Sequence, residues 1–144
     1  MEIKNRTATF DYFIEDKFDA GMMLTGTEVK ALREGKVSFN DSYCLFDQEE
    51  LYIKGLHISP YSHGSYANHN PIRDRKLLLK KKEINRIAQK LKEKGFTIVP
   101  LKIYFNDRGF AKIQIGLGKG KKLHDKRESI KERETQREIK RFLK

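Results

Sequence analysis

Hydrophobic and polar positions follow a strand-like pattern along most of the first 118 residues. Runs rich in β-branched and aromatic residues, separated by short polar or glycine-containing turns, are typical of strands. The last two runs should form a hairpin across Asn106-Asp107-Arg108-Gly109, since hydrophobic residues alternate with Lys112 and Gln114 in its second arm. The pattern predicts strands at residues 8–14, 21–24, 37–45 (interrupted near 41–42), 51–58, 77–79, 96–105 and 110–117.

Two stretches have a helical pattern instead. A short helix is expected from Thr27, its predicted N-cap, to Gly35, with Glu28 in the first turn where a carboxylate suits the helix dipole. A second helix begins at Lys81, because apolar residues recur at positions 84, 87, 88 and 91. Strands around an amphipathic helix predict a mainly β fold with flanking helices, namely a small closed antiparallel barrel of the oligonucleotide-binding (OB) type. An open α+β sheet is the alternative.

Residues 119–144 have a different composition, with 11 Lys or Arg and 5 Asp or Glu, and hold net +6 of the chain's +11. Such a segment buries too little apolar surface to offset the entropy of ordering it, so we expect a tail that is disordered when free. Its residues favour a helix once a polyanion binds them. Ile139, Phe142 and Leu143 would form one apolar patch on that helix. We therefore divide the chain into a body, residues 1–118, and a tail, residues 119–144, joined by a flexible glycine-containing segment at 116–120.

The net charge of +11 and the pI of about 9.7 favour an anionic partner. No apolar run approaches the roughly 20 residues of a membrane-spanning helix, and the first ten residues, MEIKNRTATF, lack the apolar block of a signal peptide. Cys44 is the only cysteine, so an intrachain disulfide is ruled out. We expect Cys44 to be a buried thiol. We expect a cytoplasmic monomer without a membrane partner.

Basic residues gather in two blocks of the body, and 15 Phe or Tyr residues accompany them. A run of charged residues usually forms only a solvated surface, but two basic blocks together with the basic tail favour RNA binding. His57, His63 and His69 could suggest a metal site, yet the loop has no cysteine or carboxylate to complete it. We expect no catalytic residue, metal or cofactor, although a general single-strand binder, a metal-dependent nuclease and a ribosomal structural protein remain alternatives. The basic candidates for RNA contact are Lys30, Arg33, Lys36, Arg73, Arg75, Lys76 and Lys80.

Six stretches of the chain closely resemble the SsrA-binding protein family, also called small protein B, whose members bind transfer-messenger RNA in bacteria. They are GxxLTGTEVKALREGK at 21–36, DSY at 41–43, HISPY at 57–61, RDRKLLL at 73–79, PLKIYF at 100–105 and KGKKLHDKRESIKERE at 119–134. The resemblance implies an OB-like barrel of about six strands without catalytic activity. It also implies an adaptor that delivers transfer-messenger RNA to stalled ribosomes for trans-translation, that is, nascent-chain tagging and ribosome rescue.

The resemblance also implies where RNA binds. Tyr12, Asp19, Leu78 and Lys80 would contact the tRNA-like domain of transfer-messenger RNA, and Asn5 and Arg6 are the candidates for an N-terminal contact. The tail would become helical in the empty mRNA channel and decoding centre of the ribosome. Its implied contacts are Gly120, Lys121, Lys122, His124, Asp125, Lys126, Arg127, Phe142 and Leu143. A direct contact with elongation factor Tu in the delivery complex stays open.

Overall fold

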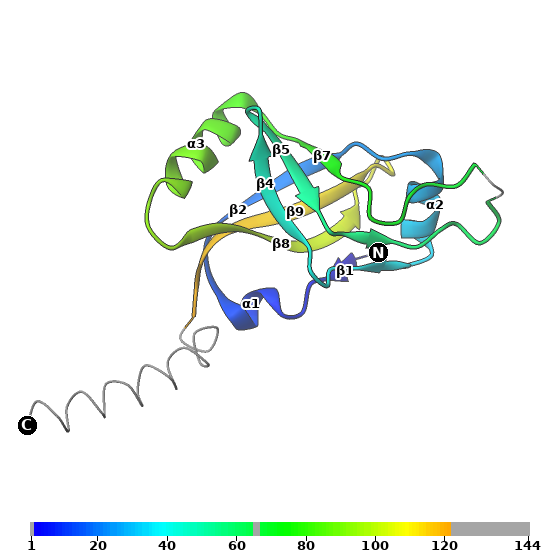
Figure 1. The fold of residues 1–144 in the computed structure, drawn as a ribbon, viewed down its shortest axis with the longest axis horizontal. Helices are drawn as coiled ribbons and strands as arrows, with labels where there is room; N and C mark the ends of the chain where they lie inside the picture. The colour runs from blue at the N-terminus through cyan, green and yellow to red at the C-terminus, as the bar shows by residue number, and fades with distance from the viewer. Residues whose placement is uncertain (1, 65–66, 122–144) are drawn as a thin grey trace, which may run out of the picture.

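The computed structural model describes residues 2–64 and 67–121, which form a curled antiparallel sheet with helices packed around it (Figure 1). The elements within these residues are β1 (Glu2–Lys4), α1 (Ala8–Asp11), β2 (Tyr12–Met22), α2 (Gly26–Arg33), β3 (Val37–Ser38), β4 (Tyr43–Asp47), β5 (Glu50–Lys54), β6 (His57–Ile58), β7 (Arg75–Leu78), α3 (Lys81–Leu91), β8 (Phe96–Phe105) and β9 (Ala111–Gly120).

The main sheet has the order β1-β8-β9-β2-β7-β5-β4, and β3 pairs with β6 in a separate two-stranded sheet. The mainly β architecture is therefore confirmed, but the prediction of a closed barrel was wrong. Within residues 2–64 and 67–121, the edge strands β1 and β4 are not hydrogen-bonded to each other, although β4 lies beside β8.

The sheet stays open because other groups bond the edge of β8 that faces away from β9. β1 pairs with β8 from Lys102 to Tyr104. Just before this segment, the backbone N–H of Asn5 donates to the Leu101 carbonyl and its side-chain amide to the Pro100 carbonyl, both at 2.8 Å. Pro100 itself has no N–H to offer. β4 therefore meets β8 through side chains rather than through a ladder of hydrogen bonds.

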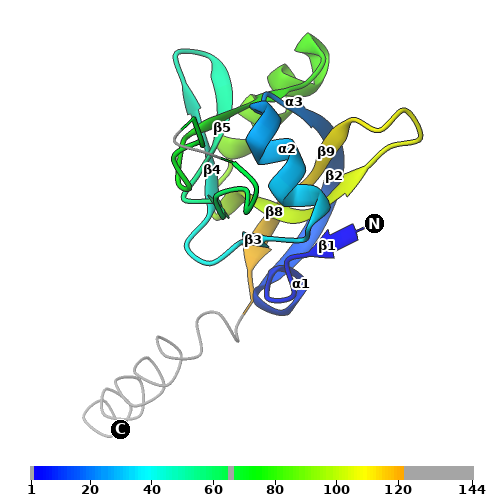
Figure 2. The same ribbon diagram turned by 90° about the vertical axis from the view of Figure 1, so that its right-hand side faces the viewer.

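The core lies on the inward side of the curled sheet. Alternate residues of β2, Phe18, Ala20 and Met22, point into it, and α2 and α3 add their own buried side chains. Figure 2 shows α2 in front of the sheet, where Ala31 and Leu32 are fully buried. The single cysteine is a buried thiol, as predicted, and burial raises the pKa of Cys44 to about 12.

The strongest periodic patterns are confirmed, namely the helix that begins at Lys81 and the hairpin of β8 and β9. Other local predictions were wrong. Residues 8–11 form the short helix α1 instead of the start of a strand, and residues 21–22 continue β2. The predicted strand at 37–45 is split between two sheets, and the N-cap of α2 is Thr25, two residues before the predicted Thr27.

The glycines near the end of β9 do not form the expected flexible joint. β9 runs to Gly120, and Gly116 and Gly118 are buried in the sheet. A Cβ atom on Gly118 would lie 2.9 Å from the Phe13 carbonyl oxygen and 3.0 Å from Ile14 Cδ1. These glycines are required because β2 and the side chain of Ile14 approach β9 too closely for a larger residue.

We predict that Gly118→Ala destabilises the protein by about 1–3 kcal/mol, since the added methyl meets a backbone oxygen that cannot move without shifting β2. Urea denaturation measures the free energy of unfolding. Gly26→Ala is the matched control, because nothing lies within 4 Å of the added Cβ. Equal stabilities of the Gly118→Ala and parent proteins would contradict this packing.

Candidate RNA interface

The outward side of β2 and β7 brings three predicted contact residues together. Gly21 is paired with Leu78, whose Cβ lies 3.3 Å from the position of an added Gly21 Cβ. Asp19 precedes Gly21 by two residues, so it lies on the same side of the sheet. Asp19 and Leu78 are exposed, Leu78 at 47%. Lys80 follows at the start of α3 and is also exposed.

Two further lysines lie on this outward side and were not among the predicted site residues. Lys17 alternates with Asp19 on β2, and Lys112 is the β9 partner of Gly21. Neither forms an ion pair with a residue in the described part of the chain. The strand alternation at 110–117 could have indicated Lys112. We call Lys17, Asp19, Leu78, Lys80 and Lys112 the outward face.

Tyr12 lies at the other end of β2, seven residues from Asp19 and therefore about 20 Å along the strand. It is half-buried and packs against a small cluster formed by Ala8, Val99 and Leu101. The start of the predicted tail is next to it. Gly120 is paired with Tyr12, and the Lys121 N–H donates to the Asp11 carbonyl at 2.8 Å. The Lys121 ammonium lies 5.0 Å from the centroid of the Phe13 ring.

The predicted N-terminal contacts differ in their exposure. Arg6 is exposed, whereas the Asn5 side chain is half-buried and bound to the Pro100 carbonyl. Asn5 therefore serves to fix the N-terminal segment against β8. Lys76 is half-buried and pairs with Glu50 at 3.1 Å on the surface, a contact weak enough for a phosphate to compete with it.

The predicted cations in α2 and just after it belong to a different surface. α2 packs Ala31 and Leu32 into the core on the inward side of the sheet, opposite to the side that carries Asp19. The predicted contact residues Lys30, Arg33 and Lys36 are all exposed. Aromatic rings support two of them: the Lys30 ammonium lies 5.5 Å from the centroid of the Tyr61 ring, and the Arg33 guanidinium 5.7 Å from that of Phe105.

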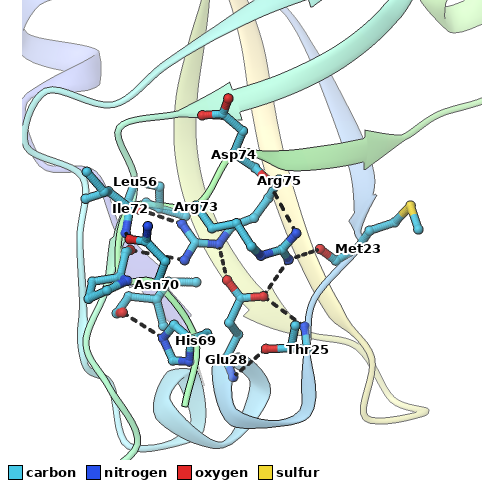
Figure 3. A network of polar contacts seen from close by, with 12 residues as sticks. Met23, Thr25, Glu28, Leu56, His69, Asn70, Ile72, Arg73, Asp74 and Arg75 are labelled. Atoms are coloured by element: carbon cyan, nitrogen blue, oxygen red, sulfur yellow. Dashed lines mark hydrogen bonds and ion pairs between the residues drawn. The ribbon is translucent and has the colours of Figure 1, made fainter. Parts of the chain in front are cut away.

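Arg75 is not a surface residue, so its predicted RNA contact was wrong. Its side chain is fully buried, where Nε donates to the Glu28 carboxylate and the other nitrogens donate to the carbonyls of Leu56 and Pro71 (Figure 3). The alternation of β7 places Arg75 on the same inward side as Leu77. Arg73 is half-buried and donates to the other Glu28 oxygen at 2.6 Å.

Glu28 is therefore the centre of a buried polar network. Besides the two arginines, the backbone N–H of Thr25 donates to its carboxylate at 2.8 Å, which completes a capping box at the start of α2. Burial alone raises the pKa of Glu28, but the hydrogen bonds from Arg73, Thr25 and Arg75 outweigh it, so the pKa is lowered from 4.5. The prediction of Glu28 in the first turn is confirmed, and its partners, 45 and 47 residues away, were not foreseen.

The long polar loop is fixed to the body in its described parts. The His69 ring bonds the Thr27 hydroxyl through Nδ1 and the Ile58 carbonyl through Nε2, both at 2.8 Å. Asn68 bonds both the N–H and the carbonyl of Tyr61. Both ring nitrogens of His69 are thus used by the fold itself. Among the described residues, no group of three or more His, Cys, Asp or Glu is arranged to hold a metal ion.

Most of the predicted tail contacts lie outside the described residues. Of that set, only Gly120 and Lys121 are described. The others are Lys122, His124, Asp125, Lys126, Arg127, Phe142 and Leu143. None of the described helices is both long and apolar enough to span a membrane.

Comparison with known proteins decides the family. The family model described as SmpB protein matches residues 2–144. The chain belongs to the SmpB family. An SsrA-binding protein of Cytophaga hutchinsonii is 52% identical over 99% of this chain and 93% of its own length, and one of Fervidobacterium nodosum is 54% identical over 97% and 94%. A solved structure described as "tmRNA-SmpB: a journey to the center of the bacterial ribosome" is 53% identical, with a TM-score of 0.70 over 83% of this chain and 84% of that one.

We predict that Glu28→Gln destabilises the protein by about 3–5 kcal/mol, because Arg75 would then be a buried charge without a counter-charge. Urea denaturation at neutral pH measures the loss. Glu34→Gln is the control, since the Glu34–Lys36 pair is exposed and 3.9 Å long, and it should change stability by less than about 0.5 kcal/mol.

The stability difference between the parent protein and Glu28→Gln should also depend on pH. Because folding lowers the pKa of Glu28, its ion pairs stabilise the fold fully above about pH 4.5 and less as the pH falls through the lowered value. The stability gap between the parent protein and Glu28→Gln should therefore narrow on acidification below pH 4.5. A gap that stays constant or widens there would contradict the role of the Glu28 charge.

Proposed function

We propose that this chain is a non-enzymatic RNA-binding adaptor that binds the tRNA-like domain of transfer-messenger RNA and delivers it to stalled ribosomes for trans-translation. The composition of the outward face is the main support for this proposal. It combines lysines free of ion pairs among the described residues with an exposed leucine and an exposed carboxylate, all on one side of neighbouring strands. Membership of the SmpB family and the similarity to the tmRNA-SmpB structure support it.

Each group on the outward face has a distinct task in this proposal. Lys17, Lys80 and Lys112 contact phosphates, which supplies affinity and orientation without reading sequence. Leu78 packs against a sugar or an unstacked base. Asp19 repels phosphates, so its task is to accept hydrogen bonds from base edges or ribose hydroxyls. A folded RNA that presents such donors between phosphates is preferred over an unstructured strand.

The tail is proposed to occupy the empty mRNA channel and decoding centre. One observation supports this proposal: the described residues of the tail, 119–121, lie at the end of β9 and just after it, beside Tyr12 rather than on the outward face. A body bound to RNA could therefore extend its cationic tail elsewhere. Lys30 and Arg33 of α2, Lys36 just after it, and the N-terminal Arg6 stay predicted RNA contacts outside the outward face.

We predict that Lys80→Ala weakens binding to transfer-messenger RNA about three- to tenfold and reduces the slope of log Kd against log salt by about one, because one phosphate contact is lost. Filter binding or fluorescence anisotropy at several salt concentrations measures both quantities. Lys94→Ala is the control, since Lys94 is equally exposed but lies beyond the far end of α3. Equal effects of the two variants would contradict a contact specific to the outward face.

A second test separates the body from the tail. A chain that ends at Lys121 should bind transfer-messenger RNA with nearly unchanged affinity, since the outward face is complete in it, and should fail to support nascent-chain tagging on stalled ribosomes. Tagging in a reconstituted translation reaction with a truncated message is the readout. Loss of RNA affinity and tagging together would refute the division of labour, and retained tagging would refute the role of the tail.

A further inference from the structure

One hydrogen bond on the outward side of the sheet joins Asp19 to a residue that the RNA proposal has not used. The Tyr104 hydroxyl donates to Asp19 Oδ1 at 2.8 Å. Asp19 is on β2 and Tyr104 on β8, so the tyrosine side chain reaches across β9, which lies between them. The other oxygen, Oδ2, forms no hydrogen bond with a residue in the described part of the chain. Tyr104 thus holds one half of the carboxylate and leaves the other half exposed.

The Tyr104 ring also contacts a lysine of its own strand. Lys102 lies two residues earlier on β8, and its ammonium sits 5.5 Å from the centroid of the Tyr104 ring. The same ammonium pairs with Glu2 of β1 at 2.8 Å. The ion pairs of the described residues join Lys102 to Glu2 and not to Asp19. The result is a chain of contacts across the sheet that runs from Glu2 through Lys102 and Tyr104 to Asp19.

The Tyr104 hydroxyl stays protonated at neutral pH and so can donate a hydrogen bond. Burial and the hydrogen bond to Asp19 raise the pKa of Tyr104 to about 12. A donor hydroxyl can bond the carboxylate, whereas a phenolate would repel it. The arrangement therefore restricts the rotation of an exposed aspartate that would otherwise move freely among its rotamers.

We propose that Tyr104 is a positioning residue for RNA recognition: by holding Oδ1 of Asp19, it aims Oδ2 at a base edge or a ribose hydroxyl of the folded RNA. The inference rests on the proposed function, because it needs RNA at the outward face. It adds that the Tyr104–Asp19 pair contributes selectivity rather than general affinity. A carboxylate gains nothing from phosphates, so only RNA that presents a hydrogen-bond donor at this place benefits from its fixed position.

The test uses the full chain with Tyr104→Phe, Asp19→Ala and the double variant. Tyr104→Phe should weaken binding to transfer-messenger RNA about fivefold, because the Asp19 side chain would then have to be immobilised on binding. Its affinity for an unstructured RNA and its salt slope should stay unchanged. The double variant should bind no more weakly than Asp19→Ala alone, since Tyr104 acts only through Asp19. Tyr52→Phe is the matched control, because the Tyr52 hydroxyl also donates to a surface carboxylate, Glu50, at 3.0 Å.

Several results would overturn the inference, and they differ from those that would overturn the proposed function. Unchanged binding by Tyr104→Phe, or an equal loss for both RNAs, would reject positioning. An additional loss in the double variant would show that Tyr104 acts independently of Asp19. If Asp19→Ala binds normally while Lys80→Ala loses affinity, the inference fails and the proposed function stands; if neither variant loses affinity, both fail.

Discussion

The buried Glu28 carboxylate is the interaction on which the rest of the structure depends. It caps α2, binds Arg75 on the inward side of β7, and binds Arg73, which also donates to the Met23 carbonyl just after β2. Residues 23–28 and residues 73–75, which lie 45 to 47 residues apart at the Glu28 contacts, thus meet at one charge. Burying such a group is costly unless every oxygen is paired, so the network favours one relative placement of α2, β2 and β7. That placement creates the outward face.

The outward face and the α2 surface divide the basic charge of the body between two sides. On the outward side, lysines of β2 and β9 accompany an aspartate that is hydrogen-bonded to Tyr104, the arrangement from which we propose recognition of a folded RNA. On the other side, Lys30 and Arg33 lie over aromatic rings, which restrains them while leaving their charge exposed. The chain carries its large positive charge in separate places, which is consistent with an adaptor that meets more than one RNA.

The sequence predicted what depends on local periodicity. α3 and the β8–β9 hairpin have regular patterns over ten or more residues, and both are present. Prediction from the sequence failed where a residue distant in sequence determines whether a side chain is buried or how strands pair. Arg75 lies in a charge run that suggests a solvated surface, and only its pairing with Glu28, 47 residues away, makes burial possible. The open sheet depends similarly on Asn5 binding the edge of β8. The family resemblance pointed to Asp19 and Leu78 as candidates, but the hydrogen bond of Tyr104 to Asp19, 85 residues away, is visible only in the fold.

The most direct test of the account is an NMR titration of the full ¹⁵N-labelled chain with the tRNA-like domain of transfer-messenger RNA. The account predicts that the largest amide shift changes fall on the outward face, at residues 17–21 of β2, at 78–80 and around Lys112. Changes confined to α2 and the 59–71 loop, with the β2 and β7 amides unaltered, would contradict it.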